Sequence, residues 1–143
     1  MPGPSRLVAM AALALTAGLL GAGAVWAQAG RDTTAAAEPV MRQLEAFRSG
    51  DYDAAYAFAS EEIRQMFDRA AFERMVKDGY PEIARSAWAV VSGSEAAPDG
   101  RVYLVLRIRG VNGNGVAAVY EMVWDGSAWK INGVVTRPDP GFV

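Results

Sequence analysis

The segment Val102-Tyr103-Leu104-Val105-Leu106-Arg107-Ile108-Arg109 carries a large apolar side chain at every second position. Successive side chains of a β-strand point to opposite faces, so one face of this segment is continuously apolar. The same alternation continues in two later segments, which are separated from the first by clusters of Gly, Asn and Asp. These patterns predict antiparallel strands from about Ala87 onward. The apolar members of the two later segments are Tyr120, Met122 and Trp124, then Trp129 and Ile131.

The connecting turns determine which residues face each other across this sheet. A four-residue turn between Trp124 and Trp129 places these two side chains opposite each other. A three-residue loop, Asn112-Gly113-Asn114, places Leu106 opposite Tyr120, whereas a two-residue turn would put arginines on the apolar face. We therefore predict the three-residue loop. The outer face of the sheet then carries Arg101, Tyr103, Val105, Arg107, Val119, Glu121, Val123 and Lys130.

The residues before the strands have helical spacing. Pro39 suits a first helical turn, and Val40, Leu44 and Phe47 follow at positions that form one apolar stripe. This pattern predicts a helix that ends at Ser49-Gly50. Three residues with side chains that favour the N-cap position predict the starts of three further helices; they are Asp51, Ser60 and Asp68.

Helices followed by an antiparallel sheet with one apolar face predict an α+β fold, because the helices must cover that face. We expect several helices packed on a curved antiparallel sheet of about four strands. Residues 38–143 are enough for one such domain. Residues 30–37 are predicted to form a short flexible segment in front of it.

The first residues of the chain have the composition of an export signal. No residue from Leu7 to Ala29 is charged, most are apolar, and Arg6 precedes them. This pattern is typical of a secretory signal peptide covering residues 1–29. Cleavage is expected after Ala29, with Ala27 as the alternative site, which predicts a periplasmic or secreted protein. An uncleaved segment that anchors the chain in the inner membrane is the alternative.

The composition of the 143-residue chain excludes much catalytic chemistry, because it contains neither cysteine nor histidine. Disulfides, thiolate or imidazole metal sites, and Ser-His-Asp or Cys-His catalysis are therefore impossible. Lys and Arg number 14 against 16 Asp and Glu, a net charge of −2, so we expect no nucleic-acid partner. The acidic residues at the predicted helix starts are explained by capping. We expect no metal and no cofactor.

Several strings along the chain resemble a known family, including residues 54–60 and 72–76 and the three quoted next. The string Gln43-Leu44-Glu45-Ala46-Phe47-Arg48-Ser49-Gly50-Asp51-Tyr52 resembles the opening of the family called domain of unknown function 4864. Gly79-Tyr80-Pro81 and the closing Trp129-Lys130-Ile131-Asn132-Gly133 also resemble it, in the same order. The resemblance implies a short exported bacterial protein with a cone fold like that of nuclear transport factor 2, in which helices cross a curved sheet and often leave a pocket. It implies no established activity.

Cone folds of this kind include ketosteroid isomerases and polyketide cyclases, which use a carboxylate base with a tyrosine or a protonated acid in an apolar cavity. This chain has suitable tyrosines but no clear base, because the predicted register puts Glu121 on the outer face. A filled aromatic core without a cavity is the alternative. The residues predicted to line a ligand pocket are Tyr56, Phe58, Phe67, Phe72, Tyr80, Tyr120, Met122, Trp124 and Trp129.

The outer sheet face combines a basic row with apolar side chains. Glu121 lies diagonal to Arg107, near enough to pair with it, which is typical of a solvated face. The interleaved valines would leave an apolar surface exposed unless a partner covers it, and a second copy of the chain is the partner we consider. The predicted interaction residues are Tyr103, Val105, Arg107, Val119, Glu121 and Val123.

The sequence thus favours a non-catalytic binding module over an enzyme. The expected ligand is a small apolar molecule in the cone, and the expected protein partner binds the outer sheet face. An isomerase or cyclase that uses a tyrosine and a carboxylate is one alternative, and a purely structural homodimer is another. Membrane contact is expected only through the signal peptide before its cleavage.

Overall fold

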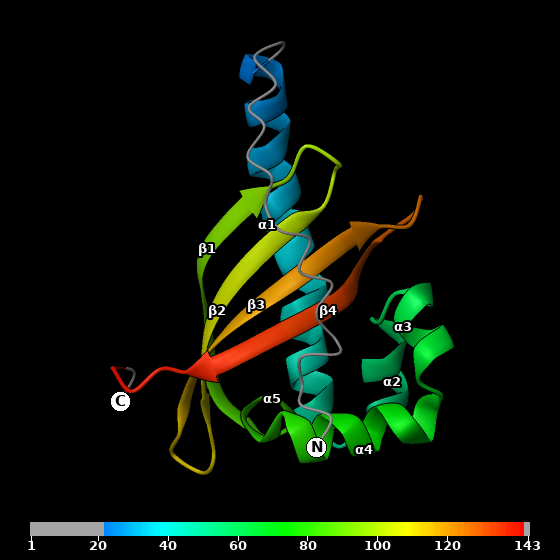
Figure 1. The fold of residues 1–143 in the computed structure, drawn as a ribbon, viewed down its shortest axis with the longest axis vertical. Coiled ribbons are helices and arrows are strands. Elements are labelled where there is room, and N and C mark those ends of the chain that lie inside the picture. The colour runs from blue at the N-terminus through cyan, green and yellow to red at the C-terminus, as the bar shows by residue number, and fades with distance from the viewer. Residues whose placement is uncertain (1–21, 142–143) are drawn as a thin grey trace.

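The computed structural model describes residues 22–141, and the side chains from residue 33 onward. Helices come first in this part of the chain and strands follow (Figure 1). The helices are α1 (Ala22–Arg48), α2 (Tyr52–Ala57), α3 (Glu61–Met66), α4 (Arg69–Gly79) and α5 (Pro81–Ala84). The strands are β1 (Ser86–Ala96), β2 (Val102–Gly110), β3 (Gly115–Trp124) and β4 (Trp129–Pro138).

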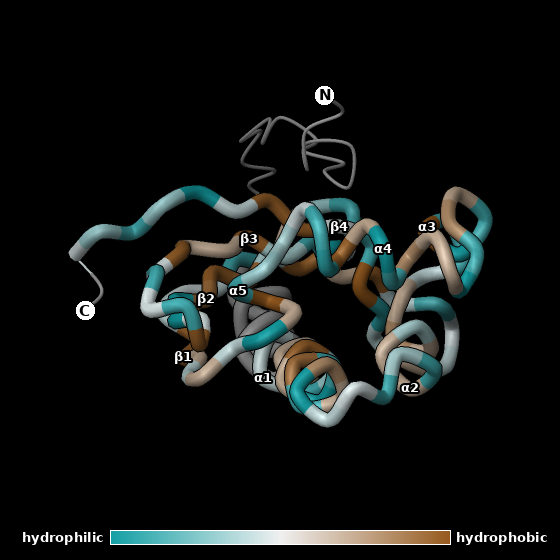
Figure 2. Tube along the Cα trace, turned by 90° about the horizontal axis from the view of Figure 1, so that it is seen from below, coloured by the Kyte–Doolittle hydropathy of each residue, from teal (hydrophilic) through white to brown (hydrophobic). Residues whose placement is uncertain are grey.

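The four strands form one antiparallel sheet in the order β1-β2-β3-β4. The sheet curves around α1, which lies across its concave side, while α2, α3 and α4 gather at the end near β4 (Figures 1 and 2). The predicted α+β fold is therefore confirmed, including the order of helices before strands.

The core lies between α1 and the concave face of the sheet. Leu104, Leu106 and Ile108 are completely buried there, and so are Val40 and Leu44 of α1. Burying these side chains supplies the main free-energy gain of folding, about 1.5–3 kcal/mol for each large one. The alternating segment around Leu104 is therefore the centre of the fold.

The three predicted N-caps are confirmed. Asp51 Oδ1 accepts a hydrogen bond from the backbone N–H of Ala54, at the start of α2. Ser60 and Asp68 cap α3 and α4 in the same way. Each cap satisfies a backbone donor that the first helical turn leaves without an intrahelical partner.

The first helix begins earlier than the spacing around Pro39 predicts. α1 extends from Ala22, so Pro39 lies inside it and residues 30–37, predicted as a flexible segment, are helical. Ala36 is completely buried, which gives these residues a place in the core. The predicted signal peptide falls mostly on residues 1–21, outside the described part of the chain.

Among residues 22–141, no helix combines the length and the hydropathy that a bilayer requires.

The β2–β3 register differs from the prediction by two residues. Leu104, not Leu106, faces Tyr120, and Leu106 faces Ala118. The predicted loop Asn112-Gly113-Asn114 was wrong by one position, because Gly110 N–H donates to Asn114 O and residues 111–113 therefore form the connection. A shift of two leaves every side chain on its predicted face. The pairing of Trp124 with Trp129 is confirmed.

The outer edge of β4 is covered by the segment between α2 and α3. Ser60 N–H donates to Ile131 O at 2.8 Å, and Ile131 N–H donates to Phe58 O at 2.9 Å. These bonds form a short parallel bridge between Ala59 and Ile131. The exposed edge of the sheet is thereby tied to the helices that surround the candidate site.

Candidate functional site

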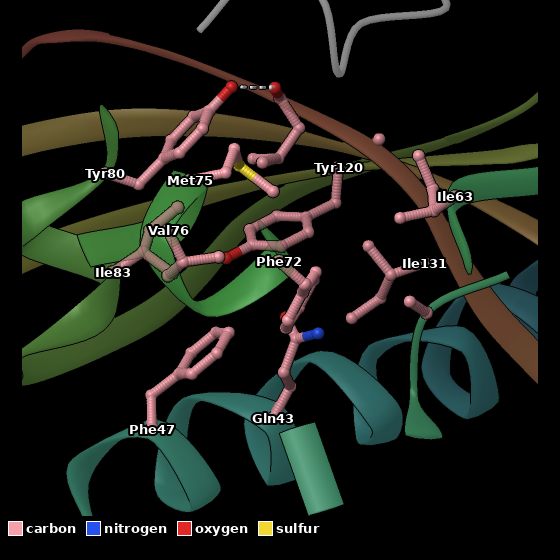
Figure 3. A pocket seen from close by; sticks show the side chains of 13 residues that line it. Gln43, Phe47, Ile63, Phe72, Met75, Val76, Tyr80, Ile83, Tyr120 and Ile131 are labelled. Atoms are coloured by element: carbon pink, nitrogen blue, oxygen red, sulfur yellow. Dashed lines mark hydrogen bonds between the residues drawn. The ribbon is translucent and has the colours of Figure 1, made fainter. Parts of the chain in front are cut away.

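A pocket opens between the helices and the concave face of the sheet near β4. It encloses about 390 Å³ of space, part of which is open to solvent, and only a small part is wide enough for the centre of a water molecule. Figure 3 shows the side chains converging on this space from α1, α3, α4, α5, β3 and β4. The lining residues are Gln43, Phe47, Ala59, Ile63, Phe72, Met75, Val76, Tyr80, Ile83, Tyr120, Ile131, Gly133 and Val134.

Three residues predicted for the pocket line it: Phe72, Tyr80 and Tyr120. Tyr56 lies beside the pocket, because its hydroxyl donates to Phe67 O at 2.7 Å and its ring packs against Phe72. The other predicted residues also lie outside the lining. Phe58 and Phe67 are half-buried next to the core, Met122 is completely buried within it, and Trp124 and Trp129 lie at the end of the β3–β4 hairpin.

The two tryptophans form a pair away from the pocket. Their ring centroids are 5.7 Å apart at an interplanar angle of 67°, an edge-to-face contact. Trp124 is 55% exposed. The predicted register was right for this pair, but the two residues form the last pair of the β3–β4 hairpin and neither lines the pocket.

The pocket also contains a polar residue that the sequence interpretation missed. Gln43 lies on the buried stripe of α1 between Val40 and Phe47, and it is only 4% exposed. Its Nε2 donates to Ala55 O at 3.0 Å. A glutamine at a helical position that spacing assigns to the core is the signal that could have identified it.

The remaining polar atoms of the lining are two tyrosine hydroxyls. Tyr80 Oη donates to Val134 O at 3.4 Å, a long hydrogen bond drawn as a dashed line in Figure 3. Tyr120 Oη is buried and has no hydrogen-bond partner among the described residues. Burial raises the pKa of both phenols above the ordinary value, so both are protonated at neutral pH.

Met75 lies at the mouth of the pocket. It is half-buried, whereas the other lining residues are buried. Met75 belongs to α4, which is drawn below the sheet in Figure 1. A methionine side chain is unbranched and adapts its shape easily.

Glu121 occupies a different site, on the outer side of the sheet. It is only 4% exposed, and Tyr103 Oη and Asn132 Nδ2 donate to its carboxylate at 3.0 and 2.7 Å. Ser60 Oγ in turn donates to Asn132 Oδ1 at 2.7 Å. We call Ser60, Tyr103, Glu121 and Asn132 the Glu121 cluster. Its hydrogen bonds connect three strands to the start of α3 and so stabilise the fold.

The expected pairing of Glu121 with Arg107 was wrong. Arg107 Nε pairs with Asp139 Oδ2 at 2.8 Å, and Arg101 Nε lies 3.4 Å from Glu121. The reason is the two-residue register shift: Arg107 faces Ala117 and Glu121 faces Tyr103. Asp139 directly follows β4, where its N–H donates to Gly115 O, and its carboxylate reaches Arg107. Burial, followed by the hydrogen bond to Glu121, raises the pKa of Tyr103 to about 12.

The rest of the outer face is more open than the Glu121 cluster. Val105, Arg107, Val119 and Val123 are half-buried there, beside the more exposed Trp88 and Val90 of β1. The interaction residues predicted from the sequence therefore divide into two groups. Tyr103 and Glu121 are held in a buried cluster, whereas the valines and Arg107 remain accessible.

No group of three or more potential metal ligands occurs among the described residues.

Sequence comparisons assign the chain to a family. No curated protein matches the chain. The profile of the family described as a domain of unknown function (DUF4864) matches residues 31–143, which is most of the chain, so this protein belongs to that family.

Proposed function

We propose that this protein is an exported, non-catalytic binding module that holds a small, largely apolar ligand between α1, α4, α5 and the sheet. The observation that carries the proposal is the pocket itself: apart from Gln43 and two tyrosine hydroxyls, its lining is apolar or aromatic. Such a lining, with few polar groups, is typical of small-molecule sites. The layout also supports kinship with the cone fold of nuclear transport factor 2.

The alternative of an isomerase or cyclase needs a carboxylate base at the pocket. Neither Asp nor Glu occurs among the residues that line it. The buried carboxylate of Glu121 belongs to the Glu121 cluster on the outer side of the sheet. These two observations favour binding over catalysis.

Blocking the mouth of the pocket tests the proposal. Ethylbenzene binding to residues 30–143 is measured by isothermal titration calorimetry for the unchanged domain, Met75→Trp and Met66→Trp. Met66 is 53% exposed and does not line the pocket, so it provides the same substitution elsewhere. We expect Met75→Trp to abolish binding and Met66→Trp to leave it unchanged. Equal binding by all three would refute the site.

Export is supported by the uncharged run from Leu7 to Ala29 and the small residues at its end. The test is the intact mass of the protein from the periplasm of a bacterial expression host. We expect a chain that begins at Gly30. A full-length chain recovered with the inner membrane would favour the anchored alternative.

A second candidate function is assembly into a homodimer through the outer sheet face. The observation that favours it is an accessible apolar surface formed by Trp88, Val90, Val105, Val119 and Val123. A two-fold contact would bury this surface on both copies at once. We expect sedimentation velocity to show a dimer that Val119→Glu dissociates. Val111→Glu, in an exposed loop, serves as the control and should leave the dimer intact.

A further inference from the structure

The hydroxyl of Tyr120 is an exception among the buried polar groups of the pocket. Tyr120 is 1% exposed, and its Oη has no hydrogen-bond partner within the described residues. Buried hydroxyls in native proteins are almost always hydrogen-bonded, because water is lost on burial and must be replaced. An unsatisfied donor that lines a cavity therefore indicates a ligand group that completes it.

The position of the ring supports this interpretation. Figure 3 shows Tyr120 extending from β3 among Met75, Val76 and Phe72, with its oxygen inside the ring of lining side chains. The backbone of β3 is held by its neighbours β2 and β4. The hydroxyl is thus presented to the pocket by a rigid element, and a guest must adapt to it.

The other polar groups of the lining already have partners. Gln43 Nε2 donates to Ala55 O, and Tyr80 Oη donates to Val134 O. Tyr120 Oη is therefore the polar group of the lining that lacks a partner among the described residues. A ligand in the pocket would contact this hydroxyl and, apart from it, mainly carbon atoms.

The charge of the lining restricts the guest further. No Lys, Arg, Asp or Glu occurs among the lining residues, so an ionised ligand would be buried without a counter-charge at high cost. Burial raises the pKa of Tyr120, which keeps the phenol protonated and able to donate. A protonated phenol is a good donor to a neutral oxygen acceptor.

We propose that the pocket binds a small neutral carbonyl compound, a ketone, aldehyde or ester with an apolar body, whose oxygen accepts a hydrogen bond from Tyr120. This inference rests on the proposed function and names its ligand class. The interior is narrow, so the guest is no larger than a single ring and enters only if the flexible Met75 side chain gives way.

Three single-ring probes that differ in their polar group can test this inference separately from the proposed function. Acetophenone, ethylbenzene and benzoate are compared by calorimetric titration of residues 30–143, Tyr120→Phe and Tyr56→Phe. We expect the unchanged domain to bind acetophenone roughly threefold to tenfold more tightly than ethylbenzene, the contribution of one neutral hydrogen bond. Tyr120→Phe should remove this difference. Tyr56→Phe, which loses a hydroxyl outside the pocket, should retain it.

Each contrary result has a defined meaning. Equal binding of acetophenone and ethylbenzene by the unchanged domain would overturn the carbonyl inference and leave the proposed function standing. Preference for benzoate would overturn the neutral ligand class. If neither acetophenone nor ethylbenzene binds, both proposals are overturned. Circular dichroism and urea unfolding of the two variants establish that the comparison is made on folded protein.

Discussion

The hydroxyl of Tyr120 has a consequence for stability as well as for binding. Its burial without a partner opposes folding of the ligand-free protein, so Tyr120→Phe should raise the free energy of unfolding by about 1 kcal/mol. Tyr56→Phe should lower it by a similar amount, because the Tyr56 hydroxyl donates to Phe67 O. Urea unfolding at neutral pH measures both. Destabilisation by Tyr120→Phe would show that the hydroxyl has a partner in solution.

Glu121 should be sensitive to the loss of a single acceptor atom. Glu121→Gln preserves the shape but leaves one oxygen for the donors Tyr103 and Asn132. We expect the free energy of unfolding to fall by about 1–3 kcal/mol. Glu95→Gln provides the control, since Glu95 is exposed on β1 opposite Tyr103. A loss no larger than that of the control would contradict the role assigned to the Glu121 cluster.

These residues also differ in how far the sequence predicts them. Asp51, Ser60 and Asp68 were identified as caps because capping depends on a side chain and a backbone donor only three residues away. The burial of Glu121 could not be predicted in this way. Its partners come from β2 and from Asn132, which lies at a register shift in β4, and local spacing contains no information about them.

At the scale of elements, the β2–β3 hairpin depends on its contact with α5. Asn112 Nδ2 donates to Glu82 Oε2 at 2.9 Å, and Val111 N–H donates to Arg85 O at 2.8 Å. The sequence predicted a register two residues away because the turn was evaluated without α5, an element that the sequence interpretation missed. The faces were still correct, since apolar alternation alone determines them.

Gly110 tests this contact directly. A Cβ added there would lie 2.7 Å from Asn112 Oδ1 and 3.1 Å from the backbone Cα of Glu82. Gly110→Ala should therefore lower the free energy of unfolding by about 1–3 kcal/mol, because α5 has to move. Gly79→Ala is the matched control, with no atom near the added Cβ. Similar thermal unfolding of the two variants would contradict close packing of α5 on the hairpin.

α1 shows the limits of helix-start signals. Pro39 fits a first turn, yet it lies inside the helix, where proline cannot donate to the carbonyl four residues earlier and its ring crowds that carbonyl. The residues before it, including Ala36, pack into the core and extend the helix beyond the position that the signal favours. Tertiary burial thus outweighs a local preference that was correctly identified.

At the scale of the whole molecule, the layers were predictable and the pocket was only partly so. The apolar alternation required helices on one face of the sheet. The location of the pocket depends on how α4 and α5 cross the end of that face, which no local pattern specifies. Phe72, Tyr80 and Tyr120 were identified as pocket aromatics, Tyr120 from the alternation of its strand and Phe72 from helical spacing. Trp124 and Trp129 continue the strand alternation but do not line the pocket.

The buried tyrosines should make the folded protein less stable at alkaline pH. Burial raises the pKa of Tyr80, Tyr103 and Tyr120 in the folded state, that of Tyr103 to about 12, whereas the unfolded chain ionises near the ordinary value of 10.0. The protonated phenols therefore favour the folded state fully below pH 10, and this contribution is lost as the pH rises from 10 through 12.

Tryptophan fluorescence during urea unfolding at several pH values between 8 and 12 measures this loss. We expect the free energy of unfolding to fall above pH 10, and to fall less steeply in Tyr103→Phe, which has one ionisable phenol fewer. The variant also lacks the hydrogen bond to Glu121, so its stability at pH 8 should already be lower, by about 1–2 kcal/mol. The difference in slope between Tyr103→Phe and the unchanged protein from pH 10 to 12 isolates the ionisation of Tyr103, because Lys77, Tyr80 and Tyr120 are present in both. An unchanged slope in Tyr103→Phe would mean that Tyr103 titrates alike in the folded and unfolded chains.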